Sequence, residues 1–335
     1  MVFVPQLAFV ERKALEYELG QHLLNKIRQH NIPIEIYERR LPSVDPNLTA
    51  RERFFHFKRT LVVGIWRRRE FQTCKPSAHY QLPLVSGCPG LCQYCYLHTN
   101  LANRPYVKVY VNTDDIFDRA QKYITARKEE TVFEASATSD PIAVEKWTGS
   151  LRRAIKFTTE VPNTRLRFVT KFADVDTLLG LDHQGKTEVR FSINAHWAMQ
   201  RFEQGVPPVR KRLEAAACIQ KEGYRVGILI APIFMFPDWQ REYDSLIQDV
   251  AKTMPTAPLT FELITHRFTM RAKAVINDVF PESELPLAED ERQLKYGQFG
   301  YTKLVYRREQ MKELESFFQD RIKTLLPKAE ILYFV

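Results

Sequence analysis

Six short apolar segments rich in β-branched and aromatic residues recur along the chain, and stretches with helical spacing separate most of them. The segments cover residues 79–87, 131–137, 166–172, 188–194, 225–232 and 259–264. Strands that alternate with helices are typical of a parallel sheet, because right-handed crossovers join its strands. The pattern predicts an incomplete (β/α) barrel of six units, with a doubly wound sheet as the alternative.

The stretches between these segments predict helices. They cover residues 114–128, 143–158, 207–223 and 238–253. Pro207 and Pro208 suit the start of the third helix, and Gly223 suits its end. Residues 173–182, between the third and fourth strands, have room for only a short helix.

Two flanking regions lie outside the six units. Residues 1–78 predict a helix at 11–30, a basic stretch and a strand at 60–65. Residues 276–335 predict an acidic loop, a hairpin within 296–309, a helix at 310–326 and a final strand. We therefore predict an α/β fold: a partial (β/α)6 TIM-like barrel at 79–275, an N-terminal α/β extension at 1–78, and a C-terminal β-hairpin plus helix at 276–335.

The net charge of +9 is gathered in clusters that also carry aromatic residues, such as 51–59, 66–70 and 265–273. Cations for phosphates and rings for stacking suit a nucleic-acid partner, although solvated faces of a basic protein explain the charge equally well. The chain has no apolar run of membrane-spanning length and no secretion signal at its start. We expect a cytoplasmic protein with no membrane partner.

Three of the five cysteines stand close together after the first predicted strand. Cys88, Cys92 and Cys95 have the spacing C-x3-C-x2-C, and the loops that follow barrel strands hold the site. A zinc site could take His98 as its fourth ligand. A redox pair of Cys92 and Cys95 would leave Cys88 unexplained. A 4Fe–4S cluster held by three cysteines keeps one iron open, which the amino and carboxylate groups of S-adenosylmethionine can chelate.

The cysteine spacing, with Tyr94 directly before Cys95, resembles the signature of the radical S-adenosylmethionine superfamily. Residues 77–97 and 133–141 are similar to the spore photoproduct lyase family, and the resemblance extends over nearly the whole chain. It implies a carbon–carbon lyase that uses a 5′-deoxyadenosyl radical to split the spore photoproduct, 5-thyminyl-5,6-dihydrothymine, back into two thymines. The alternatives are a radical enzyme acting on another nucleic-acid substrate and a zinc-stabilised nucleic-acid-binding protein.

The resemblance also implies partners and cofactors. UV-damaged DNA is the substrate, the protein works in the bacterial spore, and an electron donor such as flavodoxin or ferredoxin reduces the 4Fe–4S cluster. The cluster is held by Cys88, Cys92 and Cys95, and S-adenosylmethionine chelates the fourth iron.

By the same resemblance, five residues face S-adenosylmethionine. Tyr94 packs against adenine, Lys171 binds the carboxylate, Ser192 and Asn194 bind carboxylate or ribose, and Ala231 leaves room for adenine. Each could instead be a packing residue at the mouth of the barrel. The functional role is favoured for Lys171 and Ser192. For Asn194 and Ala231 the two roles are equally supported.

One position departs from the family pattern. The family uses a cysteine after the second strand to return a hydrogen to thymine, and Ala137 stands there. An alanine C–H bond is much stronger than S–H, so we expect an impaired or engineered variant, or a donor elsewhere. Cys218 is expected to be a buried small hydrophobe, and the sequence does not place Cys74. Tyr96 resembles the tyrosine that relays hydrogen to the cofactor.

Lesion contacts are predicted at two places. Ser139 and Asp140 contact the lesion or cap the next helix. The hairpin offers Lys303, Tyr306 and Arg307 as a wedge against which a poorly stacked lesion can be extruded. The alternative is that these residues belong to an exposed edge hairpin, whose charges keep it from pairing with another chain.

Overall fold

The computed structural model describes residues 3–101, 104–255, 258–296, 300 and 302–335. Its larger sheet has seven strands in the order β14-β11-β10-β9-β8-β7-β4, and all its neighbouring strands are parallel. The strands are β4 (Tyr80–Leu82), β7 (Thr131–Ala135), β8 (Thr164–Thr170), β9 (Thr187–Ile193), β10 (Arg225–Ile233), β11 (Thr260–Thr265) and β14 (Glu330–Phe334). All six predicted strand segments are confirmed, in chain order.

The larger sheet is open, because its end strands β4 and β14 do not pair with each other in the described part of the chain. The fold is therefore mixed α/β with a parallel sheet, and the finer description as a partial barrel remains a prediction. Strands β8 and β9 are almost wholly buried. Both strands nevertheless carry charged residues, and their buried Arg167 and Arg190 form ion pairs with Glu262 of β11.

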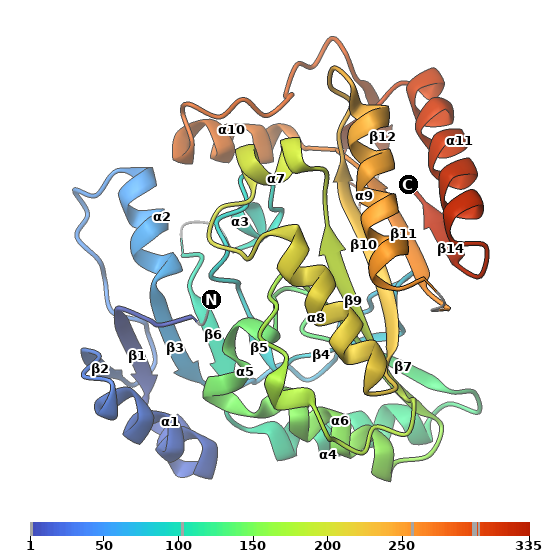
Figure 1. The fold of residues 1–335 in the computed structure, drawn as a ribbon. Helices are drawn as coiled ribbons and strands as arrows, with labels where there is room; N and C mark the ends of the chain where they lie inside the picture. Colours follow the sequence, from blue (N-terminus) through green and yellow to red (C-terminus); the bar gives the residue numbers. More distant parts are fainter. Residues whose placement is uncertain (1–2, 102–103, 256–257, 297–299, 301) are drawn as a thin grey trace.

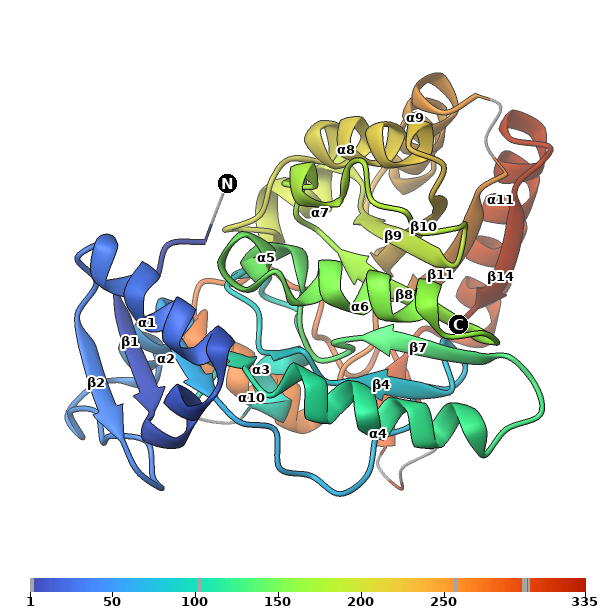
Figure 2. The same cartoon turned by 90° about the horizontal axis from the view of Figure 1, so that it is seen from below.

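Along the chain, helices lie between the strands of this sheet (Figures 1 and 2). They are α4 (Thr113–Thr125), α5 (Ile142–Thr148), α6 (Ser150–Glu160), α7 (His196–Phe202), α8 (Val209–Lys221), α9 (Trp239–Thr253) and α10 (Met270–Val279). The predicted helix 143–158 is in fact two helices, because Gly149 adopts φ +62° between them. Glycine enters that left-handed region without steric cost. Residues 173–182 hold only the short 3-10 helix η2 (Asp176–Leu178), as expected.

A second sheet, which the sequence did not predict, lies beside the first (Figure 1). Its order is β2-β1-β3-β6-β5. The elements are β1 (Leu7–Glu11), β2 (Ile34–Tyr37), β3 (Thr60–Gly64), β5 (Val85–Ser86) and β6 (Val107–Tyr110), with η1 (Arg12–Glu16), α1 (Glu18–Gln29) and α2 (Ala50–Lys58). Only the strand at 60–65 was expected, and the predicted helix 11–30 is η1 followed by α1.

The chain crosses between the two sheets just before the cysteines. The predicted strand 79–87 is divided into β4 in the larger sheet and β5 in the smaller one, where β5 pairs antiparallel with β6. Pro83 lies between them and has no N–H with which to continue a ladder. Because β5 and β6 follow residue 78, the smaller sheet extends beyond the predicted N-terminal extension.

The C-terminal region has the predicted elements in the predicted order, but the hairpin spans 293–305 and not 296–309. Strands β12 (Gln293–Tyr296) and β13 (Thr302–Val305) pair antiparallel, and α11 (Arg308–Leu325) and β14 follow. Residues 297–299 and Tyr301, which fall within the predicted hairpin range, lie outside the described residues. Among the described helices, none has both the length and the apolar character that crossing a membrane requires.

Candidate active site

The loop that carries the three cysteines joins β5 to the short helix α3 (Leu97–Asn100). It begins at Gly87, which has φ +79° and lies so close to the neighbouring strand that a Cβ atom would be 2.0 Å from the Tyr106 oxygen. Lys58 at the end of α2 donates from Nζ to the main-chain oxygens of Cys88 (2.7 Å) and Gly90 (2.8 Å). The smaller sheet and its helix therefore help to shape this loop, together with main-chain bonds from Gly87, Leu91 and Gln93 to Thr138, Gln204 and Phe202.

Among the three cysteines of this loop, Cys92 is buried, and Cys88 and Cys95 are half-buried. Burial raises the pKa of the Cys88 and Cys92 thiols, that of Cys92 to about 12, and the charge of Cys95 contributes to both shifts. The loop turns tightly around these residues, because Cys95 N donates to the Cys92 oxygen (3.1 Å) and Gly90 N donates to the Cys88 sulfur (3.3 Å). Bound iron would compensate the cost of burying these thiolates, because thiolate ligation to iron replaces solvation. The donor set therefore fits an iron–sulfur cluster.

His98 lies apart from the cysteine side chains. Its ring packs on Phe54 and Phe280, with centroids 4.7 and 5.9 Å away, and neither ring nitrogen has a hydrogen-bond partner among the described residues. A zinc site needs four ligands around one point. Within the described residues, no three His, Cys, Asp or Glu side chains are grouped for a single ion. Cysteines that hold different irons of a cluster do not need to converge on one point.

A buried ionic cluster lies beside Cys92. The Glu203 carboxylate accepts hydrogen bonds from Lys171 Nζ (2.8 Å) and the Tyr94 hydroxyl, and it forms an ion pair with Arg212 at 2.6 Å. Burial alone would raise the pKa of Glu203. The charges of Lys171 and Arg212 outweigh it and lower that pKa to about 2. Glu203 therefore stays ionised, and no pattern in the sequence pointed to it.

The predicted cofactor residues divide into two groups. Lys171 Nζ lies 3.0 Å from Ser192 Oγ and 5.7 Å from the centre of the Tyr94 ring, so these three side chains meet. The Asn194 amide is buried and donates to the Pro232 oxygen, while its own oxygen accepts from Ala195 N and the Tyr243 hydroxyl. These bonds support the packing role for Asn194. Ala231, near the end of β10, is half-buried.

Ala137 and Tyr96 are in direct contact. The Tyr96 hydroxyl donates to the Ala137 main-chain oxygen at 2.6 Å. The Tyr96 residue is 56% exposed, but this bond directs its hydroxyl inward. Desolvation and the negative charges of Cys95, Glu134 and Cys74 raise the pKa of Tyr96. The charge of Glu134 also raises the pKa of the Cys74 thiol, so this carboxylate acts on both groups.

Cys74 sits in a tight turn that buried charges hold in place. Its oxygen accepts from Ser77 N (2.9 Å) and Ala78 N (3.2 Å). The Ser77 hydroxyl donates to Glu134 (2.9 Å) and accepts from Arg190 (3.0 Å). Burial, and then the charge of Glu134, raise the pKa of Cys74 to about 12. The sulfur therefore keeps its proton at neutral pH. Cys218, on α8, was expected to be buried, but it is half-buried.

Ser139 and Asp140 are engaged within the protein. The Ser139 hydroxyl donates to the Gly87 oxygen. Asp140 accepts from the Thr170 hydroxyl (2.8 Å) and Lys171 N (2.7 Å). Burial raises its pKa to about 6, against the lowering effect of these bonds and of main-chain bonds from the first turn of α5. These contacts favour the capping role for Asp140.

The hairpin residues differ in exposure. Tyr306 is 3% exposed, its hydroxyl accepts from Met235 N at 2.9 Å, and the Arg292 guanidinium lies 3.7 Å from its ring centre. Its place is therefore in the core beneath the hairpin and not on a surface that DNA could touch. Arg307 is exposed and donates to the Asp290 oxygen at 2.5 Å. Lys303, on β13, is half-buried.

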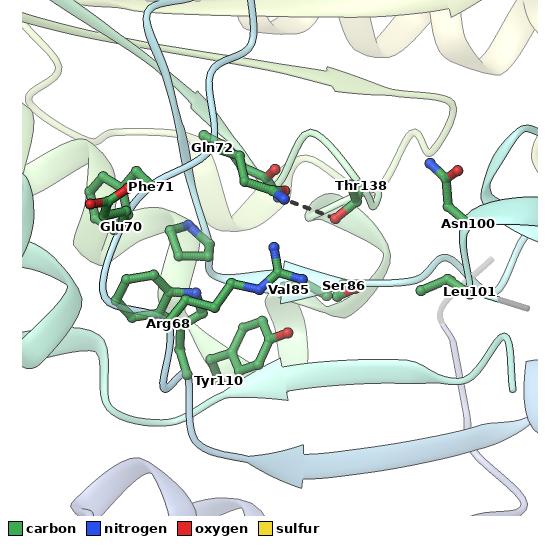
Figure 3. A pocket seen from close by; sticks show the side chains of 13 residues that line it. Arg68, Glu70, Phe71, Gln72, Val85, Ser86, Asn100, Leu101, Tyr110 and Thr138 are labelled. Atoms are coloured by element: carbon green, nitrogen blue, oxygen red, sulfur yellow. Dashed lines mark hydrogen bonds between the residues drawn. The ribbon is translucent and has the colours of Figure 1, made fainter. Parts of the chain in front are cut away.

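A cavity of about 260 Å³ lies between the two sheets, next to Ala137 (Figure 3). Gln81 donates to Thr138 across its wall at 3.2 Å. Arg68 and Tyr110 line the opposite side. Ser86, two residues before the first cysteine of the loop, also lines the cavity, which thus reaches the cysteine loop.

Comparison with known proteins gives consistent matches over the full chain. The family model of spore photoproduct lyase matches residues 3–335. The spore photoproduct lyase of Clostridium acetobutylicum is 42% identical over 97% of both chains. That of Bacillus subtilis is 41% identical over 99% of this chain and 98% of the relative.

Two solved structures are also closely similar. A spore photoproduct lyase complexed with dinucleoside spore photoproduct has a TM-score of 0.97, 43% identity and full coverage of both chains. A variant of spore photoproduct lyase with one cysteine changed to alanine and one serine changed to cysteine has the same TM-score, identity and coverage. That variant holds AdoMet and the dinucleoside lesion.

Proposed function

The chain belongs to the spore photoproduct lyase family, and we propose that it is a radical S-adenosylmethionine lyase that splits the spore photoproduct in UV-damaged DNA into two thymines. The observation that carries this proposal is the meeting of the three-cysteine loop with Tyr96 and Ala137, in a fold that matches a complex with the dinucleoside lesion over its full length. The lesion places its work in the bacterial spore.

Cys88, Cys92 and Cys95 would hold a 4Fe–4S cluster, reduced by a donor such as flavodoxin or ferredoxin. With S-adenosylmethionine, this group supplies the 5′-deoxyadenosyl radical that removes a hydrogen from the lesion. The dry surroundings of Cys92 and the contacts of Lys58 with the loop support this assignment.

Lys171 would bind the carboxylate of S-adenosylmethionine. An ammonium group has three protons to donate, and Glu203 and Ser192 accept two of them. The third remains for a ligand. Glu203 and Arg212 would position Lys171, and Tyr94 would present its ring to adenine.

We assign the hydrogen donor to Cys74 and not to a residue at position 137. Fragmentation of the lesion leaves a thymine methyl radical. Transfer of the Cys74 hydrogen forms the methyl C–H bond, breaks the S–H bond and leaves one unpaired electron on sulfur. The Tyr96 hydroxyl can return a hydrogen to that sulfur and pass the unpaired electron towards the cofactor. A high thiol pKa suits this role, because a thiolate has no hydrogen to give.

The solved variant supports this assignment. It combines loss of a cysteine with a new cysteine earlier in the chain, at about the separation between Ala137 and Cys74 here. This chain carries the same combination of residues in its own sequence. On this proposal the chain has a relocated donor and full repair activity, and position 137 does not impair it.

The test uses reconstituted, reduced protein with S-adenosylmethionine and a dinucleoside spore photoproduct. We expect release of the repaired thymine dinucleoside. An iron-loaded protein that cleaves S-adenosylmethionine but leaves this lesion intact would contradict the proposed substrate. In DNA, Arg307 and Lys303 of the hairpin would contact phosphates around the lesion. Ser139 would lie close to the reaction site.

A further inference from the structure

We propose that one face of the smaller sheet binds the phosphate backbone of the DNA strand that flanks the lesion. The proposal rests on DNA being the substrate and adds a second contact region to it. We call this region the cationic strip. It comprises Arg39, Arg40, Arg68, Arg104 and Lys108, together with the rings of Tyr106 and Tyr110.

The outer part of the cationic strip is a cavity of about 340 Å³. Arg39, Arg40, Arg104 and Lys108 line it, and Glu11 is the one carboxylate among the described residues of its wall. The Glu11 carboxylate already binds Arg67 through both oxygens. Among the described residues, no carboxylate forms an ion pair with the other four cations of the cavity. Clustered positive charge of this kind attracts anions.

The inner part is the cavity beside Ala137, and β6 joins the two. Tyr106, Lys108 and Tyr110 project to one face because alternate residues of a strand share a face. Lys108 lines the outer cavity and Tyr110 the inner one, and Lys108 Nζ lies 5.4 Å from the centre of the Tyr110 ring. The exposed Arg68 side chain extends into the inner cavity near Ser86 (Figure 3).

The inner cavity also links the strip to the reaction site. Ser86 pairs with Lys108 across the sheet and lies two residues before Cys88. Thr138, in the same wall, follows Ala137, which binds Tyr96. A ligand that fills both cavities is therefore elongated, carries several negative charges, and continues from the substrate. A DNA strand has all three properties, and its bases can stack on the tyrosine rings.

The test compares duplex binding with repair of a substrate too short to reach the strip. The variant Arg39→Gln/Arg40→Gln/Arg104→Gln removes three exposed cations of the outer cavity. Binding of a lesion-bearing duplex to reconstituted protein is measured by fluorescence anisotropy over a range of salt concentrations. Conversion of the dinucleoside lesion is measured in parallel, because it reports folding and the reaction site.

We expect the variant to bind the duplex about tenfold or more weakly, with the salt slope reduced by about 0.9 for each phosphate that the protein no longer neutralises. Dinucleoside conversion stays at the parent level. The control variant Lys221→Gln/Arg225→Gln/Lys252→Gln removes three exposed cations from the opposite, amino-terminal ends of β10 and β11, and it should bind like the parent.

If the triple variant matched the parent in duplex affinity and in salt slope, the proposal that the cationic strip binds DNA would be wrong. An equal loss in the control variant would also contradict it, because the effect would then follow net charge alone. Failure of the parent protein to convert the dinucleoside would contradict the proposed repair function instead, and the binding comparison would still decide whether the strip contacts DNA.

Discussion

The hydroxyl of Tyr96 is bound to the main-chain oxygen of Ala137, 41 positions further along the chain, at 2.6 Å. A backbone oxygen can accept this hydrogen bond whatever side chain stands at position 137. The phenol can therefore keep its place when position 137 carries no thiol.

The first prediction concerns Cys74. Cys74→Ala should sharply reduce the fraction of lesion that ends as two thymines and increase adducts, because no S–H lies near the methyl radical. Cys218→Ala, the matched control on α8, should change little. Product analysis by liquid chromatography with mass spectrometry measures both.

Ala137→Cys added to Cys74→Ala should restore clean thymine, because it places a thiol at the position where the family pattern has one. If Cys74→Ala repairs as cleanly as the parent, or if Cys218→Ala loses clean repair, the donor has been assigned to the wrong residue.

The second prediction concerns the cluster. Cys88→Ala, Cys92→Ala or Cys95→Ala should each abolish the iron–sulfur absorption and the formation of 5′-deoxyadenosine, while His98→Ala keeps both. Iron and sulfide analysis with visible spectroscopy checks this. A parent protein that holds zinc, and loses it in the His98 variant, would contradict the assignment.

The third prediction concerns Lys171. Lys171→Met should weaken S-adenosylmethionine binding by at least about tenfold, because the cofactor carboxylate loses a charged hydrogen bond. Lys156→Met, an exposed lysine on α6, is the control. Calorimetric titration at equal iron content separates cofactor binding from cluster loss, and unchanged affinity would remove Lys171 from the cofactor site.

The fourth prediction concerns the hairpin. Replacing Lys303 and Arg307 with Gln should weaken binding to lesion-free and lesion-bearing DNA alike and reduce the salt slope, because phosphate contacts release counterions independently of sequence. Anisotropy titrations across salt concentrations test this. If the affinity did not depend on salt, Lys303 and Arg307 would be ordinary solvated side chains and not phosphate contacts.

The fifth prediction follows from the low pKa of Glu203. Because the folded state holds this carboxylate ionised to about pH 2, its contribution to stability is present above pH 4.5 and is lost as the pH falls towards 2. The free energy of unfolding of the parent should therefore fall more steeply over this range than that of Glu203→Gln. Urea unfolding of the cluster-free proteins measures the difference, and parallel curves would contradict it.

The larger sheet could be predicted because each of its strands is a local apolar run between turn residues. The smaller sheet could not. Its β5 is only two residues long, and β6 reaches β3 across more than forty residues. Pairing of such short segments depends on tertiary contacts, which a local pattern does not contain.

The cysteine loop was predictable because three cysteines lie within eight positions. Glu203 and Cys74 were not, because their roles depend on neighbours distant in sequence: Tyr94 and Lys171 for Glu203, and Tyr96 and Glu134 for Cys74. Asp140 and Asn194 illustrate the two roles that the sequence left open. Polar residues after strands resemble ligand contacts in a sequence, yet in the structure their hydrogen bonds are taken up by the protein.

Lys58 gives the first third of the chain a specific importance. Its ammonium group is buried and joins the end of α2 to two carbonyls of the cysteine loop. A fragment that begins at β4 would lack this ammonium group and would leave both carbonyls without their donor. The N-terminal region and the cysteine loop therefore depend on each other. Neither can be exchanged for that of a homologue unless the surface that contacts it is exchanged as well.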